Sequence, residues 1–223
     1  RKEGRMLIVP RKTSFRWFGS PDYRKVLAID HGFSFWYADR MGQRGFDYSI
    51  SPRIRFSDKL FIVYSFNQSF EYNLIGAVRN ENDNTNVYMG KRNAITITNT
   101  INAQYTFNAK AFVNLRLRHY WSSFKYDEYY MLNNDGTLNP NNTFIADNNN
   151  TNFFNIDLVY QWNFAPGSVL SVVWKNSIAL DNDKPEYNYF KNIRDVWDTP
   201  QANSISFKLL YYLDYHMIKK QNK

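Results

Sequence analysis

The sequence predicts an all-β protein whose strands form a transmembrane, antiparallel up-and-down β-barrel. The clearest evidence is the segment Asn152–Phe164. There, large apolar residues fall on one face of an extended chain and mostly Asn, Asp and Gln fall on the other, with Val159 the exception. Alternate side chains of a strand point to opposite faces of its sheet. About nine segments repeat this pattern, as expected of strands with lipid on one side and water on the other.

The connections between these segments give a second observation, because short and long ones alternate. Tight turns are expected at Ser57–Lys59, Asn108–Lys110 and Ala165–Ser168, and long polar stretches at Asn73–Asn93, Asn133–Thr151 and Asp181–Asn203. Outer-membrane barrels have short periplasmic turns and long extracellular loops. We therefore expect a bacterial outer-membrane protein with its long loops extracellular and its C-terminal end, Lys219–Lys223, in the periplasm.

Taken in order, the segments each present one outward row of apolar residues. The first, near Met6–Phe18, is the least regular, because Arg11 and Thr13 fall on one face and Lys12 and Arg16 on the other. The next two rows are Leu27, Ile29, His31, Phe33, Phe35 and Tyr37, and Phe46, Tyr48, Ile50, Pro52, Ile54 and Phe56. They are followed by Leu60, Ile62, Tyr64, Phe66 and Phe70, and by Ile95, Ile97, Ile101, Ala103, Tyr105 and Phe107.

The last four segments continue the alternation with polar residues on their other face. The sixth presents Val113, Leu115, Leu117 and Trp121, and the seventh is the row within Asn152–Phe164. The eighth presents Leu170, Val172, Trp174, Ile178 and Leu180, and the ninth Ile205, Phe207, Leu209, Tyr211, Leu213, Tyr215 and Met217. A helical period fits none of these segments as well as a period of two.

Composition is consistent with this fold and narrows the function classes. The 223 residues suffice for a single domain, 1–223, and their mean hydropathy of −0.59 leaves no run near the roughly 20 apolar residues of a membrane helix. Aromatic residues reach 18%, which suits interfacial girdles. Cysteine is absent, so no disulfide framework is expected. The net charge of +8 is scattered rather than clustered, which does not favour nucleic-acid binding.

Polar residues interrupt the outward rows at one common level. Gln68, Asn99, His119 and Asn176 each lie ten residues from the centre of the nearest tight turn. At roughly 3.3 Å per residue and a tilt of about 40°, this is a height of about 25 Å, the apolar band of an outer-membrane barrel. Trp121, Ile178 and Leu180 continue above that level, and the pattern assigns no place to Ile178 and Leu180.

Charged residues of the strands fall on the inward face. They are Asp47, Arg53, Arg55, Glu71, Arg116, Arg118, Asp157, Lys175, Asp181, Lys208 and Asp214. One interpretation is a charged pore or the wall of a substrate path. The other is a lumen whose paired charges rigidify the barrel or hold a plug. Loss of one partner would leave the other unpaired, which usually costs more than the pair contributes.

The loop Asp181–Asn203 interleaves aromatic and charged residues. Tyr187, Tyr189, Phe190 and Trp197 could stack on glycan rings or bind another protein. They could equally pack on their own loop as a lid. The stretch NNDG at Asn133–Gly136 resembles part of a calcium loop, but it lacks the alternating acidic ligands and the terminal Glu of such a site. No metal or cofactor is therefore expected.

His119 and Asn99 are expected opposite each other on the outward face. Outer-membrane phospholipases place a Ser-His-Asn set on the outside of a barrel, and catalysis requires a nucleophile within hydrogen-bond reach of the His. Ser123 lies four residues from His119, too far along an extended strand. The pair is interpreted as two interfacial polar residues bonded to each other.

The odd number of segments suggests that the barrel is incomplete. Single-chain bacterial barrels have an even number of strands, and a nine-strand path would bring its two ends together parallel. The chain opens RKEGRMLIVP, without an initiator Met or a signal peptide. We therefore expect a piece of a longer precursor, in which Ile205–Tyr215 pairs with a strand encoded before Arg1.

The C-terminal three quarters resembles a known family. The matching stretches are FDYSISPR (Phe46–Arg53), TITNT (Thr96–Thr100), LRLRHYWS (Leu115–Ser122), NNDGTLNP (Asn133–Pro140), NIDLVYQWNFAPGSVLSVVWKNSI (Asn155–Ile178) and NSISFKLLYYLDY (Asn203–Tyr215). They are similar to the barrel region of Bacteroidota outer-membrane proteins that carry a carbohydrate-binding family 9-like domain before a barrel of unknown function. The resemblance implies that this segment ends the protein. It places sugar binding on no residue of this chain.

These observations favour a non-enzymatic outer-membrane component. It would act in transport, as a pore, or as a scaffold whose extracellular loops dock other envelope proteins or surface glycans, with membrane lipid around it. The alternative is a lipid or glycan hydrolase on a barrel scaffold, for which the sequence offers no complete set of catalytic residues.

Overall fold

Most of the described residues lie in long strands of one sheet. The computed structural model describes residues 6–78, 86–146 and 148–213. The elements are β1 (Lys12–Gly19), β2 (Leu27–Ala38), β3 (Gln43–Arg55), β4 (Leu60–Val78), β5 (Tyr88–Asn108), β6 (Ala111–Leu132), β7 (Leu138–Pro140), β8 (Asn149–Ala165), β9 (Ser168–Asn182), α1 (Tyr189–Trp197) and β10 (Gln201–Leu210). No helix among the described residues is long and apolar enough to cross a membrane.

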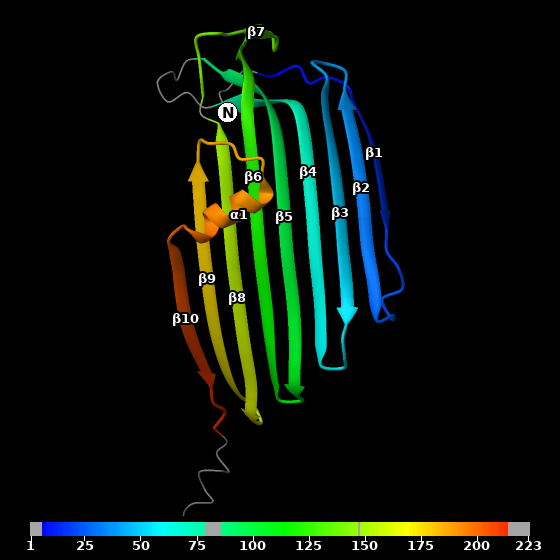
Figure 1. Ribbon diagram of the computed structural model, residues 1–223, viewed down its shortest axis with the longest axis vertical. Coiled ribbons are helices and arrows are strands. Elements are labelled where there is room, and N and C mark those ends of the chain that lie inside the picture. The colour runs from blue at the N-terminus through cyan, green and yellow to red at the C-terminus, as the bar shows by residue number, and fades with distance from the viewer. Residues whose placement is uncertain (1–5, 79–85, 147, 214–223) are drawn as a thin grey trace, which may run out of the picture.

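The strands follow one another in an antiparallel, up-and-down order (Figure 1). Among the described residues, the sheet has ten strands in the order β1-β2-β3-β4-β5-β6-β8-β9-β10, with β7 paired to β6 beside this path. The predicted all-β, antiparallel up-and-down sheet is confirmed, and its main path has nine strands. The short β7 was not predicted. Within the part of the chain that the structure describes, the sheet is open: β1 and β10 are its two edges and run in the same direction.

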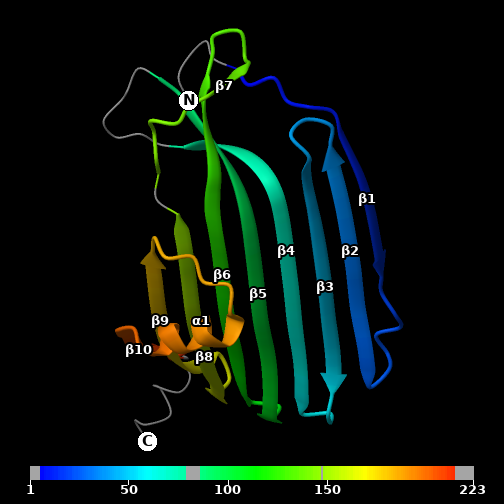
Figure 2. The same ribbon diagram turned by 45° about the horizontal axis from the view of Figure 1, so that its top comes forward.

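Short turns gather at one end of the sheet, which we call the turn end, and longer connections at the other, the loop end (Figures 1 and 2). At the turn end, 166–167 joins β8 to β9, and Gly167 has φ +70°, a conformation that a residue with a Cβ adopts only under strain. Two connections depart from strict alternation: the β1–β2 connection, residues 20–26, at the turn end, and the four-residue β2–β3 turn, 39–42, at the loop end.

The strands reach further toward the loop end than the alternation predicts. The expected loop Asn73–Asn93 is mostly strand, because β4 continues to Val78 and β5 begins at Tyr88. The alternation of apolar and polar residues is interrupted in β4, because its pairing with β5 is irregular between Glu71 and Leu74, where Asn73 has φ +55°. A bulge adds one residue to a strand, so beyond it odd- and even-numbered positions exchange the faces of the sheet on which they lie. The expected loop Asn133–Thr151 likewise contains β7 and the start of β8.

The last strand is shorter than predicted. β10 ends at Leu210, which pairs with Val169, whereas the alternation extended to Met217. Its partner β9 begins at Ser168, so further residues have no strand beside them, and the Tyr212 N–H donates instead to Ser168 Oγ at 3.0 Å. Tyr211 and Leu213 therefore lie outside the strand. Asp214, Tyr215, Met217 and Lys219–Lys223 lie outside the described residues.

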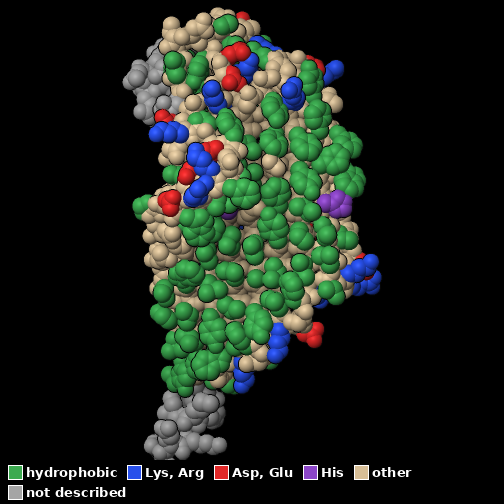
Figure 3. Space-filling model, in the orientation of Figure 1, with side chains coloured by type: hydrophobic (Ala, Val, Ile, Leu, Met, Phe, Trp, Pro, Cys, Tyr) green, Lys and Arg blue, Asp and Glu red, His purple; other side chains and the backbone are tan. Residues whose placement is uncertain are grey.

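The two faces of the sheet differ in chemistry. The face seen in Figure 3, which we call the apolar face, carries hydrophobic side chains over most of its height, with charged side chains near its two ends and around α1. Many of these apolar side chains are exposed, among them Phe35, Tyr48, Trp162 and Phe207. A small cluster of buried Met89, Tyr130 and Leu132 lies at the loop end. A second cluster lies where α1 packs on the apolar face.

Candidate functional site

The opposite face, which we call the polar face, carries the strand charges that the alternation predicted. The pairing register puts ten of these charges, Asp47, Arg53, Arg55, Glu71, Arg116, Arg118, Asp157, Lys175, Asp181 and Lys208, on this one face. The eleventh predicted member, Asp214, lies outside the described residues. The sheet thus brings together charges that are far apart in the sequence.

A charge ladder crosses three neighbouring strands of the polar face. Arg116 on β6 stands opposite Asp157 on β8, which in turn stands opposite Lys175 on β9. The Lys175 Nζ lies 3.7 Å from Asp157 Oδ1, with the side chains 63% and 41% exposed. Exposed ion pairs of this kind contribute roughly 0–1 kcal/mol because water screens them. The ladder therefore adds little to stability and leaves its charges accessible to solvent.

The ladder lies in a hollow of the sheet. The hollow measures about 680 Å³ and is lined by residues of β4 to β6 and β8 to β10, including Asn102, Gln104, Asn114 and Ser206. A smaller hollow of about 310 Å³ beside it is lined by Arg118 and Asn155 together with the ladder. Because a single hollow is lined by six strands, the sheet curves toward its polar face. Amides, hydroxyls and both signs of charge offer hydrogen-bond donors and acceptors to a polar solute.

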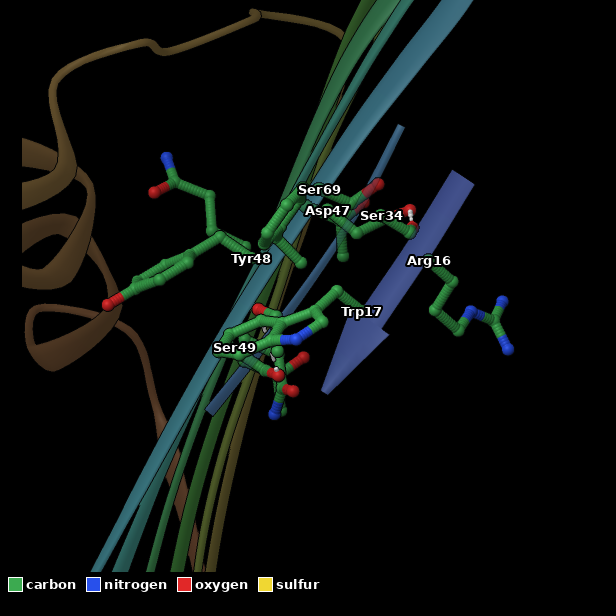
Figure 4. A pocket seen from close by; sticks show the side chains of 13 residues that line it. Arg16, Trp17, Ser34, Asp47, Tyr48, Ser49 and Ser69 are labelled. Atoms are coloured by element: carbon green, nitrogen blue, oxygen red, sulfur yellow. Dashed lines mark hydrogen bonds between the residues drawn. The ribbon is translucent and has the colours of Figure 1, made fainter. Parts of the chain in front are cut away.

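The first strands of the sheet form a second polar region. The Ser34 Oγ donates to Asp47 Oδ2 at 2.6 Å, and Arg53 Nε donates to Asp30 Oδ2 at 3.2 Å. A hollow of about 410 Å³ next to β1 is lined by Arg16, Ser34 and Asp47 among others. Figure 4 shows the alternation directly: Arg16 extends to one side of the sheet and Tyr48 to the other.

The remaining predicted charges lie apart from the ladder and from one another. The Arg55 guanidinium lies 5.9 Å from the Phe61 ring centroid, and Asp181 accepts a hydrogen bond from Thr151 Oγ1 at 2.7 Å. Lys208 stands opposite Ser171 on the neighbouring strand. Glu71 is half-buried near the loop end. The charges are therefore spread along the face rather than gathered into one binding centre.

The helix α1 forms a separate site on the apolar face. It begins after Asn188, whose side chain accepts the Lys191 N–H at 3.0 Å, and Asn192 and Val196 are its buried residues. Asn is a favoured N-cap because its oxygen satisfies a backbone N–H that has no partner within the helix. Val196 packs with Phe154 and Ile178, and Leu180 lies against the same cluster. Packing against α1 thus explains why Ile178 and Leu180 are apolar at a level where the alternation assigned them no place.

A group of buried or half-buried residues with hydrogen-bonding side chains lies between α1 and the sheet, and we call it the amide cluster: Asn99, His119, Trp121, Asn150, Asn152, Tyr189 and Asn192. Asn152 Nδ2 donates to Asn192 Oδ1 at 2.9 Å, and Asn192 Nδ2 donates back to Asn152 Oδ1. Trp121 Nε1 donates to Asn150 Oδ1 at 2.8 Å. Asn150, Asn152 and Asn192 are at most 3% exposed. Buried amides are stable only when they are paired, so these bonds require α1 to stay in place.

His119 and Asn99 are part of this cluster, and their predicted bond to each other is wrong. Asn99 accepts from Tyr64 Oη at 2.6 Å and donates to Tyr189 Oη at 2.8 Å, and the same Tyr189 hydroxyl lies 3.4 Å from His119 Nδ1. Tyr189 of α1 therefore bridges the two residues. The pattern within the strands could not predict this bridge, because Tyr189 lies 70 or more residues away in the sequence.

The hydrolase arrangement receives no support from the geometry. Ser123 is fully buried, and within the described chain its Oγ has no hydrogen-bond partner. It lies four residues from His119 on the same straight strand, roughly 13 Å away. A serine at that distance cannot pass its proton to the imidazole.

The four predicted loop aromatics separate into two kinds. Tyr189 packs onto the sheet, with its ring centroid 5.7 Å from that of His119. Tyr187, Phe190 and Trp197 stay exposed, although the Trp197 ring centroid lies 4.8 Å from that of Phe154.

The NNDG stretch is held by bonds within its own turn. The N–H and the hydroxyl of Thr137 both donate to the Asp135 carboxylate. Within residues 6–78, 86–146 and 148–213, no group of three or more His, Asp or Glu could hold a metal ion.

Sequence reasoning missed the helix and its asparagines. Tyr189, Ile193 and Val196 recur at helical spacing after Asn188, a start signal that could have revealed α1. The pairing of Asn192 with Asn152, 40 residues away, has no local signal.

Comparison with known proteins identifies a family. A family model described as Domain of unknown function (DUF5916) matches residues 1–222. No curated protein and no solved structure matches the chain.

Proposed function

Because the chain belongs to the DUF5916 family, whose description assigns no function, we propose a function from its geometry: the sheet is part of the wall of a transmembrane β-barrel in a bacterial outer membrane. The observation that carries this proposal is the exposure of the apolar face. Ile205, Phe207 and Leu209 alone are 63%, 72% and 66% exposed, and similar side chains continue across the sheet. Soluble monomers rarely expose apolar patches larger than a few hundred Å². In a membrane, lipid acyl chains would cover the same face, so its apolar side chains would not meet water.

The two open edges of the sheet support a larger barrel. An unpaired strand edge in hydrocarbon leaves backbone groups without hydrogen bonds, at several kcal/mol for each group. β1 and β10 run in the same direction, so they cannot close on each other antiparallel. An odd number of further strands between them restores both antiparallel closure and an even total. We propose that these strands precede Arg1.

The polar face then lines the lumen, and the function is transport or pore formation without catalysis. The accessible charge ladder and the hollows around it support a path for polar solutes rather than a dry, rigid lumen. In the same proposal the loop end is extracellular, where it docks other envelope proteins or glycans, and the protein is of the Bacteroidota type with a carbohydrate-binding family 9-like domain before the barrel. The resemblance noted in the sequence supports this last part.

The test is the ion selectivity of the full-length protein in planar phospholipid bilayers. The described charges of the predicted lumen set comprise six basic residues, Arg53, Arg55, Arg116, Arg118, Lys175 and Lys208, and four acidic ones, Asp47, Glu71, Asp157 and Asp181. Basic linings favour anions. We expect anion selectivity, and a reversal potential that moves toward zero when Arg116 and Arg118 are both changed to Gln.

Arg194→Gln on the exposed side of α1 is the matched control, because it removes a charge outside the lumen and should leave the reversal potential unchanged. A protein that folds into vesicles yet conducts no ions would favour the scaffold role over the pore. Hydrolysis of membrane lipid or glycan by the wild-type protein, lost on His119→Ala, would contradict a non-enzymatic function. Recovery of the full-length protein only in the soluble fraction would contradict the barrel itself.

A further inference from the structure

We propose that α1 is an interfacial anchor: its Phe190–Trp197 edge inserts into the headgroup layer of the outer membrane leaflet. This inference rests on the proposed function, because it assigns the apolar face to lipid. It adds a lipid-contacting role for a helix that the strand pattern does not contain.

Contacts with β8 fix how the helix is turned. β8 runs from the loop end to the turn end, so Asn150, Asn152 and Phe154 lie at successively lower levels toward the turn end. Asn192 binds Asn152 and Asn150, and the Trp197 ring centroid lies 4.8 Å from that of Phe154, with the two rings tilted by 52°. Asn192 therefore lies on the flank of α1 that faces the loop end, and Trp197 on the flank that faces the turn end.

Helical geometry places the other side chains relative to these two. Phe190 precedes Trp197 by seven residues, two turns of helix, so it shares the flank that faces the turn end. Asp195 lies about 160° around the helix from Trp197, and Lys191 lies near Asp195. The exposed side of α1 is thus divided: aromatic rings point toward the apolar band, and a mixed pair of charges points toward the loop end.

The aromatic flank is continuous with the apolar band. Phe190 is 80% exposed and Trp197 48%, and the rows just below them contain Ile156 and Leu117, which pack beside the helix. Just above, β8 carries Asn152 and Asn150, buried under the helix, and β6 carries the fully buried Trp121 opposite Asn152. On β8 the level of α1 is therefore the level at which the outward row changes from apolar to amide side chains, and charged side chains gather around α1 (Figure 3).

Lipid is the occupant that this arrangement favours. Tryptophan and other aromatic rings concentrate at membrane interfaces, where one side of the ring is apolar and the other meets water. Interfacial helices lie in the membrane plane with an apolar edge inward and charges outward. α1 lies across the strands rather than along them, as such a helix would. Arg194, exposed beside the aromatic flank, is placed to bind a lipid phosphate.

The experiment uses single-cysteine variants of the full-length protein in phospholipid vesicles. These 223 residues contain no cysteine, and any elsewhere in the protein is replaced by Ser. A nitroxide is attached at Phe190→Cys or, as the matched control on the same helix, at Asp195→Cys. Its accessibility to oxygen, which partitions into lipid, is compared with its accessibility to a water-soluble nickel chelate. Labels at Val172→Cys and Ser171→Cys report the middle of the two sheet faces.

We expect an oxygen-to-nickel ratio severalfold higher at position 190 than at 195, and lower at 190 than at 172. Equal, water-like ratios at 190 and 195, with 172 in lipid, would overturn the anchor and leave the barrel intact. A label at 190 shielded from both reagents would also overturn it, because a protein would then cover the helix. A water-like ratio at position 172 would instead contradict the proposed membrane barrel.

Discussion

The apolar face has two regions on the same strands, and they differ in what covers them. Between the turn end and α1, the outward rows of β8 and β9 read Ile156, Leu158 and Tyr160, and Val172 and Trp174, and these side chains remain partly exposed. Under α1, the same rows continue as Phe154, Asn152 and Asn150 on β8 and Ile178 on β9, all almost fully buried, and the two asparagines are hydrogen-bonded to Asn192. The strand geometry does not change between the two regions. The comparison teaches that alternation identifies a face, whereas a buried amide in an outward row marks a place where another part of the protein lies against that row.

The largest expected effect comes from placing a charge in the open region. Val172→Arg puts a guanidinium on the apolar face, where an Arg near the middle of a membrane costs about 2–4 kcal/mol. Ser171→Arg, one residue away, puts the same group on the polar face. We expect Val172→Arg to lower the free energy of folding into phospholipid vesicles by that amount, and Ser171→Arg to change it little, in denaturant titrations. Equal losses would contradict the assignment of the two faces.

An intermediate effect is expected in the covered region. Asn192→Ala removes the hydrogen-bond partner of the buried Asn152 amide and one partner of Asn150, which keeps its bond from Trp121 Nε1, at a cost of about 1–3 kcal/mol. Asn152→Ala should cost a similar amount. The double variant should cost clearly less than the sum, because residues in one hydrogen-bond network are coupled. Additive losses would show that the two asparagines do not depend on each other. Asp195→Ala, on the exposed side of the helix, is the control.

The smallest effect concerns acid and the start of α1. A hydrogen bond from Lys191 and backbone N–H groups lower the pKa of Glu186 to about 2, from an ordinary value of 4.5. The folded form thus binds a proton less readily than the unfolded form. The stabilisation by Glu186 is complete above pH 4.5 and is lost as the pH falls toward 2. We expect a nitroxide at position 190 to become more mobile over this range, and Glu186→Gln to remove the pH dependence. A mobility that changes equally in both would assign the effect to other groups.

The strands could be predicted because their pattern is local. Once the backbone of Asn152–Phe164 is extended, the pleat alone decides which residues share a face, so all ten described charges of the predicted set fall on one side. The turn at Pro166 and Gly167 is equally local. The predicted ends of two strands were wrong. In β4, the bulge at Asn73 interrupts the two-residue period, and β10 ends where its neighbour β9 begins, although the period continues in the sequence.

By itself, then, the sequence determined the antiparallel sheet, its nine-strand path and the chemistry of its two faces, because each depends on a period of two along the chain. Only the tertiary structure decided what covers each face. α1 folds back onto β8 and β9, Asn192 meets Asn152, and Tyr189 bridges Asn99 and His119. These contacts join residues 40 to 90 positions apart. A pattern within one strand carries no information on them, because burial of an amide is decided by the partner that approaches it in space.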